Sequence, residues 1–218
     1  MTRYAVVGAS SGTGLQLVER LAQRGSTVRA ISRNPLPSRG LVEPYKADIT
    51  DFPSIKQALH GDFDAVFFTA DIHGRKLQKD VVRAVMYDGF INTLRAAHAG
   101  GSKRIVLLSV IGPERPSWVW WILNSMKPGM RDNVRDREEV LKASPMPYVI
   151  CRAARLTDKP GGGEVAVRSA ARRLDMMSSI SRHDLSLVLA KAADCAPAGT
   201  TWDVLSGSRT SNPTWTQP

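Results

Sequence analysis

The sequence contains little cysteine and no long apolar run. Its two cysteines, Cys151 and Cys195, are too few for a disulfide framework and lack the spacing of a metal site. We therefore expect a protein of a reducing compartment that holds no metal. The apolar stretch at residues 118–123 is far shorter than the roughly 20 residues that span a bilayer. The N-terminus also lacks the regions of a signal peptide, so we expect a cytoplasmic protein without a membrane span.

Clustered positive charge is also missing, although positive charge is abundant. Thirty Lys and Arg residues against twenty Asp and Glu give a formal net charge of +10, which would suit nucleic acid, an anionic membrane or a polyanionic small ligand. The basic residues are spread along the chain, and no nucleic-acid-binding motif is recognisable. We therefore expect a basic surface and no nucleic-acid partner.

The chain does contain a regular alternation of apolar runs and helical periodicity. Helical patterns cover residues 14–25, 51–61, 77–101 and 131–144 and begin again near 181. The apolar runs between them cover residues 3–8, 26–32, 42–48, 64–70, 103–110 and 146–153, with short runs near 163–167 and 200–206. Apolar strands separated by helices predict a mostly parallel sheet with helices on both faces, the doubly wound α/β (Rossmann) fold. The length of 218 residues without a break in composition indicates one domain.

Two segments do not follow this alternation, and we expect them to form a small substrate-covering region. They lie at about residues 113–130, which read as irregular, and at about 155–180. The last residues, 207–218, are rich in Ser, Thr and Pro, so we expect a loosely held tail.

A glycine-rich turn follows the first predicted strand. Gly8 permits a tight turn, Gly12 lets the backbone approach a pyrophosphate, and Gly14 opens the first helix, whose N-terminus attracts anions. Because the turn lies between a strand and a helix, we predict a dinucleotide site rather than a simple connection. The cofactor contacts predicted here are Gly8, Ser10, Ser11, Gly12, Thr13 and Gly14.

The end of the second predicted strand indicates which nicotinamide cofactor binds. An acid there would bind the ribose 2′-hydroxyl, whereas this chain has Ser32 and Arg33, with Arg39 farther on. We therefore predict NADP(H), and a solvated surface arginine is the alternative.

Further cofactor contacts are predicted at the ends of the next two strands. Asp48 ends the third strand where an adenine amino group would lie, although it could equally cap a helix. The other contacts predicted in this part of the site are Ile49, Thr69 and Ala70.

Several motifs together resemble the atypical short-chain dehydrogenase/reductase family. This NAD(P)H-binding group includes biliverdin-IXβ/flavin reductase and the NmrA-like proteins. The motifs are VVGASSGTG, ISRNP, YKADITD, MYDGFINTLRAAHAGGSKRIVLLSVIG, VICRAARLTDKPGGGEV and ISRHDL, which together cover about residues 3–206. The chain departs from the family pattern at Ser11 in the turn, at Val110, and at Ala153 and Ala154 after Arg152.

The resemblance also implies a test for a catalytic acid. Many relatives reduce carbonyls with a Tyr-x-x-x-Lys pair, but none of the four tyrosines here has lysine four residues later. A reductase can still work when its acceptor is planar and conjugated and spreads the arriving negative charge, as flavins, quinones and tetrapyrroles do. Such a protein needs mainly orientation and positive potential.

Four residues are the candidates for these catalytic roles. Ser109 ends the fifth strand, or it bonds only to backbone as strand-end serines do. Lys127 and Arg152 would add positive potential, or would pair with buried carboxylates. Arg152 is also predicted to contact the cofactor. His73 follows the fourth strand and would donate a proton, or be a solvated loop residue.

Three tryptophans in residues 113–130 admit several interpretations. Trp118, Trp120 and Trp121 could stack on a flat acceptor, form a homodimer contact, touch a membrane surface or pack on the chain's own sheet.

Together these features predict an NADPH-dependent reductase that transfers hydride to a planar conjugated small molecule. A non-catalytic NADP(H)-sensing regulator and a non-redox isomerase or cyclase are the alternatives.

Overall fold

A computed structural model describes residues 2–74, 76–169 and 172–207 of the chain. Its central sheet has the strand order β3-β2-β1-β4-β5-β6-β10-β8, in which β8 alone pairs antiparallel. These strands are β1 (Arg3–Val7), β2 (Thr27–Ser32), β3 (Val42–Lys46), β4 (Ala65–Phe68), β5 (Ile105–Val110), β6 (Tyr148–Ala153), β8 (Val165–Ser169) and β10 (Thr200–Ser206). The order reverses between β1 and β4, as in other doubly wound sheets, and ligands of such folds bind at this point.

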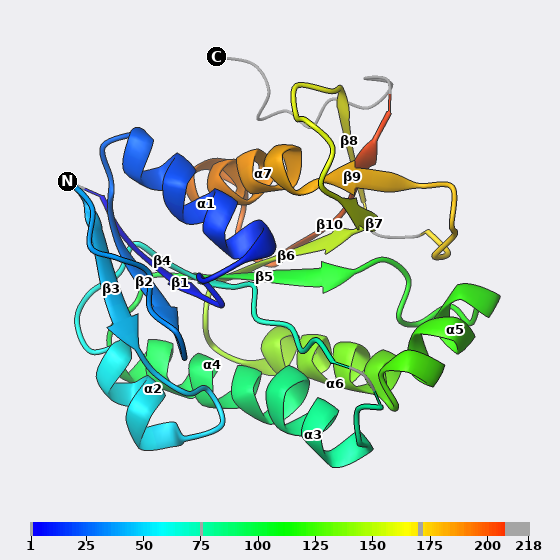
Figure 1. The fold of residues 1–218 in the computed structure, drawn as a ribbon, viewed down its shortest axis with the longest axis horizontal. Coiled ribbons are helices and arrows are strands. Elements are labelled where there is room, and N and C mark those ends of the chain that lie inside the picture. Colours follow the sequence, from blue (N-terminus) through cyan, green and yellow to red (C-terminus); the bar gives the residue numbers. More distant parts are fainter. Residues whose placement is uncertain (1, 75, 170–171, 208–218) are drawn as a thin grey trace.

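Helices cover both faces of the sheet, as predicted. On one face lie α1 (Gly12–Gln23) and α7 (Arg182–Cys195), which are side by side above the strands in Figure 1. The elements below the sheet are α2 (Phe52–Ala58), α3 (Lys79–Arg83), the π-helix η1 (Ala84–Asp88), α4 (Gly89–Ala99) and α6 (Met130–Ala143). The doubly wound single domain is therefore confirmed.

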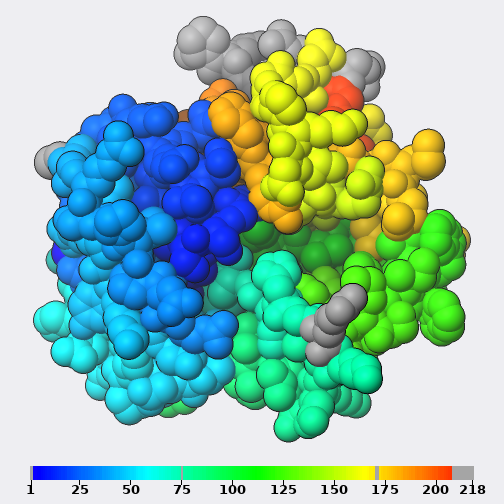
Figure 2. Space-filling model, in the orientation of Figure 1, coloured from blue at the N-terminus to red at the C-terminus, as the bar shows by residue number. Residues whose placement is uncertain are grey.

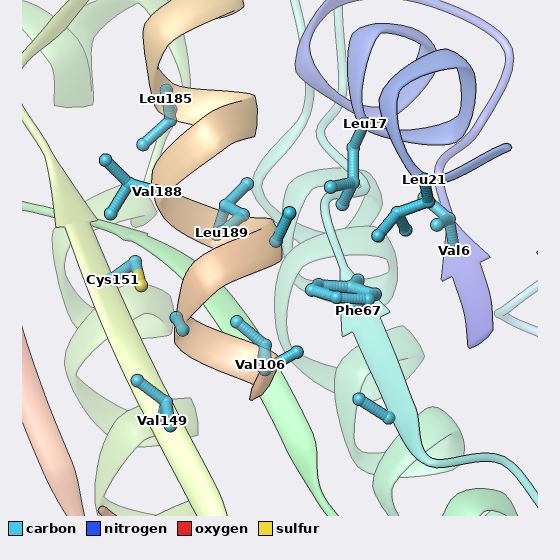
Figure 3. Packing of buried hydrophobic residues seen from close by; sticks show 14 of the residues in the cluster. Val6, Leu17, Leu21, Phe67, Val106, Val149, Cys151, Leu185, Val188 and Leu189 are labelled. Atoms are coloured by element: carbon cyan, nitrogen blue, oxygen red, sulfur yellow. The ribbon is translucent and has the colours of Figure 1, made fainter. Parts of the chain in front are cut away.

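The alternation of side chains along each strand builds a separate core on each face. In β1, Val6 packs in the cluster under α1 and α7, whereas the next residue, Val7, packs in the cluster under α2 and α4. Figure 3 shows Leu17 of α1 and Leu189 of α7 pointing toward Phe67 of β4 in the first cluster. Both layers are fixed to the same strands, so the C-terminal ends of the strands form a rigid edge.

The structure corrects two of the expected elements. Residues 113–130 are not irregular, because α5 (Trp118–Met126) forms there and begins at Ser117, whose hydroxyl accepts a hydrogen bond from the Trp120 amide. Its apolar residues lie on every side, so the sequence shows no helical period. The predicted helix 77–101 is divided by η1, whose wide turn separates α3 from α4.

A small second sheet stands above the C-terminal edge of the main one. It pairs β7 (Arg155–Thr157) with β9 (Ser179–Ser181) in parallel. Ser181 then caps α7 by accepting a hydrogen bond from the Asp184 amide at 3.0 Å. In Figure 2 the surface is hollowed between the yellow residues of this region and the teal residues that follow β4. The predicted loose tail lies outside the described residues from position 208 onward.

Candidate cofactor and active site

The glycine turn after β1 has no room for side chains at two of its positions. A Cβ on Gly14 would lie 2.2 Å from the Gly8 carbonyl oxygen, and a Cβ on Gly8 would lie 2.6 Å from the Ala70 nitrogen. Gly8 also has a φ of +90°. Thr69 holds the turn against β4 by donating its hydroxyl to the Val7 carbonyl at 2.9 Å. The backbone of the turn is thus pressed against the end of β4 while its other side faces out.

The N-terminus of α1 offers an open site for an anion. Its N-cap residue, Ser11, is extended and its side chain makes no capping hydrogen bond, and the first turn holds no acidic residue. Ser10, Ser11 and Gly12 are exposed. The amides of the first turn therefore lack a side-chain acceptor, and the helix dipole adds positive potential.

Thr13 supplies an independent sign that this turn fits a ligand. Thr13 is 6% exposed, and its hydroxyl has no hydrogen-bond partner in the part of the chain that the structure describes. Buried hydroxyls are nearly always partnered, so an orphaned one beside an uncapped helix end fits a site for a phosphate group.

At the end of β2, Arg33 and Ser32 have different environments. Arg33 is exposed, and its guanidinium makes no hydrogen bond or ion pair within the described ranges. Ser32 is buried and donates its hydroxyl to the Asn34 carbonyl at 2.7 Å, so it holds the turn that carries Arg33. Arg39 is exposed as well. The guanidinium of Arg33 can therefore bind an anion without first breaking a hydrogen bond or an ion pair.

Asp48 lies beside Arg33 at the end of β3. Burial would raise the pKa of its carboxyl, but hydrogen bonds from the Thr50 amide and hydroxyl, together with the charge of Arg33, outweigh burial and lower it. The N-cap of α2 is Asp51, so the alternative that Asp48 caps this helix is wrong. Asp48 is an ionised acceptor at neutral pH.

The next residue, Ile49, is fixed by α4. Its carbonyl accepts a hydrogen bond from the Asn92 side-chain amide at 3.0 Å. A Cβ on Gly89, at the start of α4, would lie 2.7 Å from Cδ1 of Ile49. The wall expected beside an adenine ring is therefore packed against the start of α4.

A buried charge network joins the ends of β5 and β6. Ser109 is 2% exposed and donates its hydroxyl to Oε1 of Glu138 at 2.5 Å. Arg152 binds the same carboxylate with Nε, 3.1 Å from each oxygen, and with Nη2, 2.5 Å from Oε2. Nη2 of Arg152 also contacts the carboxylate of Glu114. Burial would lower the pKa of Arg152, but these two carboxylates outweigh burial and raise it.

This network limits what Ser109 and Arg152 can do. Two carboxylates surround one guanidinium, so Arg152 adds no net positive potential here. The Ser109 hydroxyl donates its hydrogen bond to Glu138, which leaves only its lone pairs, as acceptors. Neither carboxylate was among the residues predicted from the sequence, although Glu138 falls in line with Val134 and Leu141 on the buried side of α6, which signals a buried charge with a partner.

Lys127 and His73 lie outside this network. Lys127 ends α5 and forms an ion pair at 2.6 Å with Asp71, in the loop after β4. His73 is exposed in the same loop. The pair ties the loop after β4 to α5, so the structure places Lys127 near the loop that carries His73, whereas Ser109 and Arg152 are buried at the ends of β5 and β6.

The three tryptophans of α5 have different environments. Trp120 is 1% exposed and donates its ring N–H to the Gly112 carbonyl at 2.9 Å, so it packs on the chain's own sheet. Trp118 and Trp121 are 62% and 74% exposed. Only these two are available for an acceptor or for a second subunit.

None of the described tyrosines lies at the C-terminal edge of the sheet in the arrangement that a Tyr/Lys pair would require. Tyr4 donates its hydroxyl to Asp194 at 2.5 Å, and Tyr148 begins β6 at the opposite edge. The inner face of α6 carries Met130 and Val134, which are buried in an apolar cluster. The other two tyrosines are Tyr45 of β3 and Tyr87 of η1.

Arg137 is a buried cation that sequence reasoning missed. It is 3% exposed and donates to the carbonyls of Met86 at 3.4 Å and Leu108 at 3.1 Å. Burial lowers the pKa of this guanidinium, opposed by the charges of Glu138 and Asp71. Arg137 thus ties α6 to η1 and β5 below the catalytic edge.

Comparisons with known proteins agree with this geometry. The oxidoreductase AgnL4 of Paecilomyces divaricatus is 26% identical over 217 residues, covering 89% of this chain and 80% of its own length. YhfK of Bacillus subtilis, named as an uncharacterized sugar epimerase, is 28% identical over 196 residues, covering 87% and 86%. A solved structure from Bacillus halodurans, named as a putative NAD-dependent epimerase/dehydratase, superposes with a TM-score of 0.78 at 26% identity, covering 95% of each chain.

Within the described residues no helix is long and apolar enough to cross a membrane.

The family assignment rests on a match that covers most of the chain. The family described as NAD(P)H-binding matches residues 8–196, from the glycine turn to the end of α7. The chain is therefore a member of the NAD(P)H-binding family, and the resemblance inferred from its motifs is confirmed.

Proposed function

We propose that the protein is an NADP(H)-dependent oxidoreductase. The observation that carries this proposal is the combination of an uncapped, acid-free N-terminus at α1 with the free guanidinium of Arg33 at the end of the neighbouring strand. The first site suits a pyrophosphate and the second a 2′-phosphate, so together they suit NADP(H). The oxidoreductase name of a relative supports the same class of reaction.

Most of the predicted contacts have a role in holding the dinucleotide, whereas Arg152 is engaged by Glu138 and Glu114. The amides of Gly12 to Gly14 and the Thr13 hydroxyl bind the pyrophosphate, while Ser10 and Ser11 border it. Arg33 binds the 2′-phosphate, and the ionised Asp48 accepts a hydrogen bond from the adenine amino group beside Ile49. Thr69 and Ala70 keep the turn and the loop after β4 at a fixed separation. The cofactor supplies the hydride.

The substrate proposed for this site is a planar conjugated molecule such as a flavin, a quinone or a tetrapyrrole. The described tyrosines do not supply the acid that a simple carbonyl would need, whereas a conjugated acceptor spreads the arriving charge. A pocket of about 500 Å³ is lined by Gly74, Lys76, Leu77, Ser125 and Met126, close in the chain to His73 and Lys127. Its mainly apolar lining and the ammonium of Lys76 suit a flat anionic molecule.

The four predicted catalytic residues divide into two roles. Lys127 pairs with Asp71 and so holds the loop after β4 against α5, and His73 in that loop delivers the proton. Ser109 orients the substrate or the nicotinamide through its lone pairs, since its proton is held by Glu138. Arg152 is a positioning residue, because it fixes Glu138 and thereby Ser109.

Turnover is the first test. Purified protein is mixed with NADPH and, in turn, with FMN, a tetrapyrrole and several quinones, and the loss of nicotinamide absorbance is followed. Saturable, protein-dependent oxidation with one of these acceptors is expected. Tight NADPH binding with no oxidation by any conjugated acceptor would refute the reductase.

Arg33→Ala tests the cofactor separately. Loss of a charge-assisted contact to the 2′-phosphate should weaken NADPH binding about 10- to 100-fold and leave NADH binding almost unchanged. Arg168→Ala, at an exposed arginine of β8 on the far edge of the sheet, serves as the comparison. Equal weakening of both cofactors by Arg33→Ala would refute the 2′-phosphate assignment.

One observation favours a second candidate function, a non-catalytic NADP(H)-sensing protein. The proton of Ser109 and the charge of Arg152 are both engaged by Glu138, which leaves little polar chemistry on the floor of the hollow. This candidate predicts tight cofactor binding without turnover, so the same two experiments separate it from the reductase.

A further inference from the structure

Arg182 lies directly over the glycine turn. It is the first residue of α7 and follows β9, and α7 packs beside α1. A Cβ placed on Gly12 would lie 3.3 Å from Nε and 3.7 Å from Cδ of Arg182. In Figure 2 the orange atoms of this region lie between the dark blue atoms of the turn and the yellow atoms of residues near 160. The guanidinium therefore stands at the open end of α1.

The present partner of Arg182 is a carboxylate that is almost fully in water. Nη1 of Arg182 is 2.6 Å from Oδ1 of Asp158, whose side chain is 87% exposed, whereas the Arg182 side chain is 25% exposed. Ion pairs with an exposed partner contribute about 0–1 kcal/mol, because water solvates the separated charges almost as well. Exchanging Asp158 for another anion therefore costs little.

The surroundings favour a phosphate as that other anion. The first turn of α1 has no acidic residue and no side-chain cap, and the buried Thr13 hydroxyl has no partner among the described residues. The helix dipole and the Arg182 charge both raise the positive potential at this point. Asp158 is the acidic side chain that pairs with Arg182 here.

We propose that Arg182 binds the pyrophosphate of the dinucleotide and releases Asp158 when it does so. This inference rests on the proposed function, since it requires the dinucleotide to lie across the glycine turn. Arg33 acts at the 2′-phosphate, which only NADP(H) carries, whereas Arg182 acts at the pyrophosphate, which both nicotinamide dinucleotides share.

The exchange does not require the loop that carries Asp158 to leave. Asp184 holds the same loop by accepting a hydrogen bond from the Gly162 amide at 2.7 Å. Gly161 lies so close to His183 that its Cβ would be 1.9 Å from Nδ1. The loop between β7 and β8 therefore stays docked on α7 while Asp158 gives up its partner.

The test compares the dissociation constants of NADPH and NADH for wild type and Arg182→Gln by equilibrium titration. Both constants should rise by about 10- to 100-fold and by the same factor, as expected for loss of one charge-assisted phosphate contact. Arg24→Gln is the matched control, because Arg24 pairs with Asp194 at 2.5 Å between the far ends of α1 and α7. It should change neither constant by more than about twofold.

Two further variants sharpen the test. Arg182→Lys keeps the charge and should recover part of the lost affinity for both cofactors. Asp158→Asn removes the competing carboxylate and should strengthen binding of both up to about fivefold, the equivalent of one exposed ion pair.

The other possible outcomes would refute either this inference or the proposed function. If Arg182→Gln binds both cofactors with dissociation constants within twofold of wild type, this inference alone is refuted. It is also refuted if the variant weakens the binding of NADPH and leaves the binding of NADH unchanged. A wild type that binds neither dinucleotide would refute the proposed function and this inference with it. Thermal unfolding of Arg182→Gln near the wild-type temperature shows that lost affinity is not lost fold.

Discussion

Glu138 of α6 binds Arg152 of β6 with both carboxylate oxygens, each 3.1 Å from Nε of the guanidinium. Both side chains are almost fully buried. Each charged group has therefore lost its contact with water and is stabilised by the other charge instead. Glu138 also accepts a hydrogen bond from the Ser109 hydroxyl, which joins the end of β5 to the same pair.

Removing one member of this ion pair should lower the free energy of unfolding more than replacing both members with apolar side chains. Arg152→Met leaves the Glu138 charge buried, so the free energy of unfolding should fall by about 3–5 kcal/mol. The double variant Arg152→Met, Glu138→Leu should recover most of that loss, since apolar groups can fill the space. Urea unfolding measures both. Arg135→Met, which removes an exposed arginine of the same helix, should cost under about 1 kcal/mol. A double variant no more stable than the single one would contradict this account.

Gly14→Ala should destabilise the turn and weaken NADPH binding. The new methyl would lie 2.2 Å from the Gly8 oxygen and 2.6 Å from the Thr69 hydroxyl, so α1 must move away from β4. Overpacking of this kind costs about 1–3 kcal/mol. Thermal unfolding and NADPH titration measure the two effects.

Gly25→Ala is the control for Gly14→Ala. Gly25 has a φ of +80°, and no heavy atom lies within 4 Å of the position that an added methyl group would take, so its cost is that of the backbone alone, about 1 kcal/mol. NADPH affinity should be unchanged in this variant. Unaltered affinity in Gly14→Ala as well would show that the turn does not hold the cofactor.

The two thiols should differ in reactivity. Burial raises the pKa of Cys151 to about 12, whereas Cys195 is exposed. A thiol reagent at neutral pH should modify one cysteine in the native protein and two after unfolding, as counted by mass spectrometry. Cys195→Ser should abolish the native reaction, and modification of native Cys195→Ser at a comparable rate would contradict the burial of Cys151.

Asp184 should stabilise the fold at neutral pH and lose that effect in acid. Burial would raise the pKa of its carboxyl, but hydrogen bonds from the Gly162 amide and the Ser181 hydroxyl, and the neighbouring His183, outweigh burial and lower it. Because the pKa of Asp184 is lower in the folded state than in the unfolded chain, where it is near 3.9, ionised Asp184 stabilises the fold at pH values above 3.9. This stabilisation is lost as the pH falls through the pKa of the folded state.

Asp184→Asn is the variant that tests this pH dependence. It should cost about 1–3 kcal/mol at neutral pH, and the difference from wild type should shrink below about pH 4 in urea unfolding. Asp158→Asn, which alters an exposed carboxylate of the same region, should cost little at any pH. A difference that grows in acid would contradict the assigned direction.

The sheet and most helices could be predicted because their signals are local. Val6 and Val7 lie in a run that is apolar on both faces, and the periodicity of α1 and α6 is regular enough to locate each helix. The roles of Gly8 and Gly14 in the turn followed from their spacing alone. In contrast, α5 carries Trp118 and Trp121 on its exposed side, so its composition shows no polar face and its helical period is hidden.

The contacts of the site were harder to predict because they join distant parts of the chain. Nothing near Arg182 in the sequence indicates that it reaches Gly12, since that contact depends on how α7 packs beside α1. Glu138 could have been found, because it is a charge at a core position of α6, but its pairing with Arg152 required the registration of α6 on β6.

The π turn of η1 has a consequence for the proposed adenine pocket. A wide turn contains one residue more than an α turn, so it rotates everything after it by about 100°. That rotation presents Gly89 to the side chain of Ile49, where a Cβ would be 2.7 Å away, and aims Asn92 at the Ile49 carbonyl. Deleting one residue of η1 would therefore turn a different face of α4 toward Ile49, and a bulkier side chain would push the pocket wall outward. The shape of the proposed cofactor pocket at β3 is thus encoded about forty residues downstream, in the length of a helix that need not touch the cofactor.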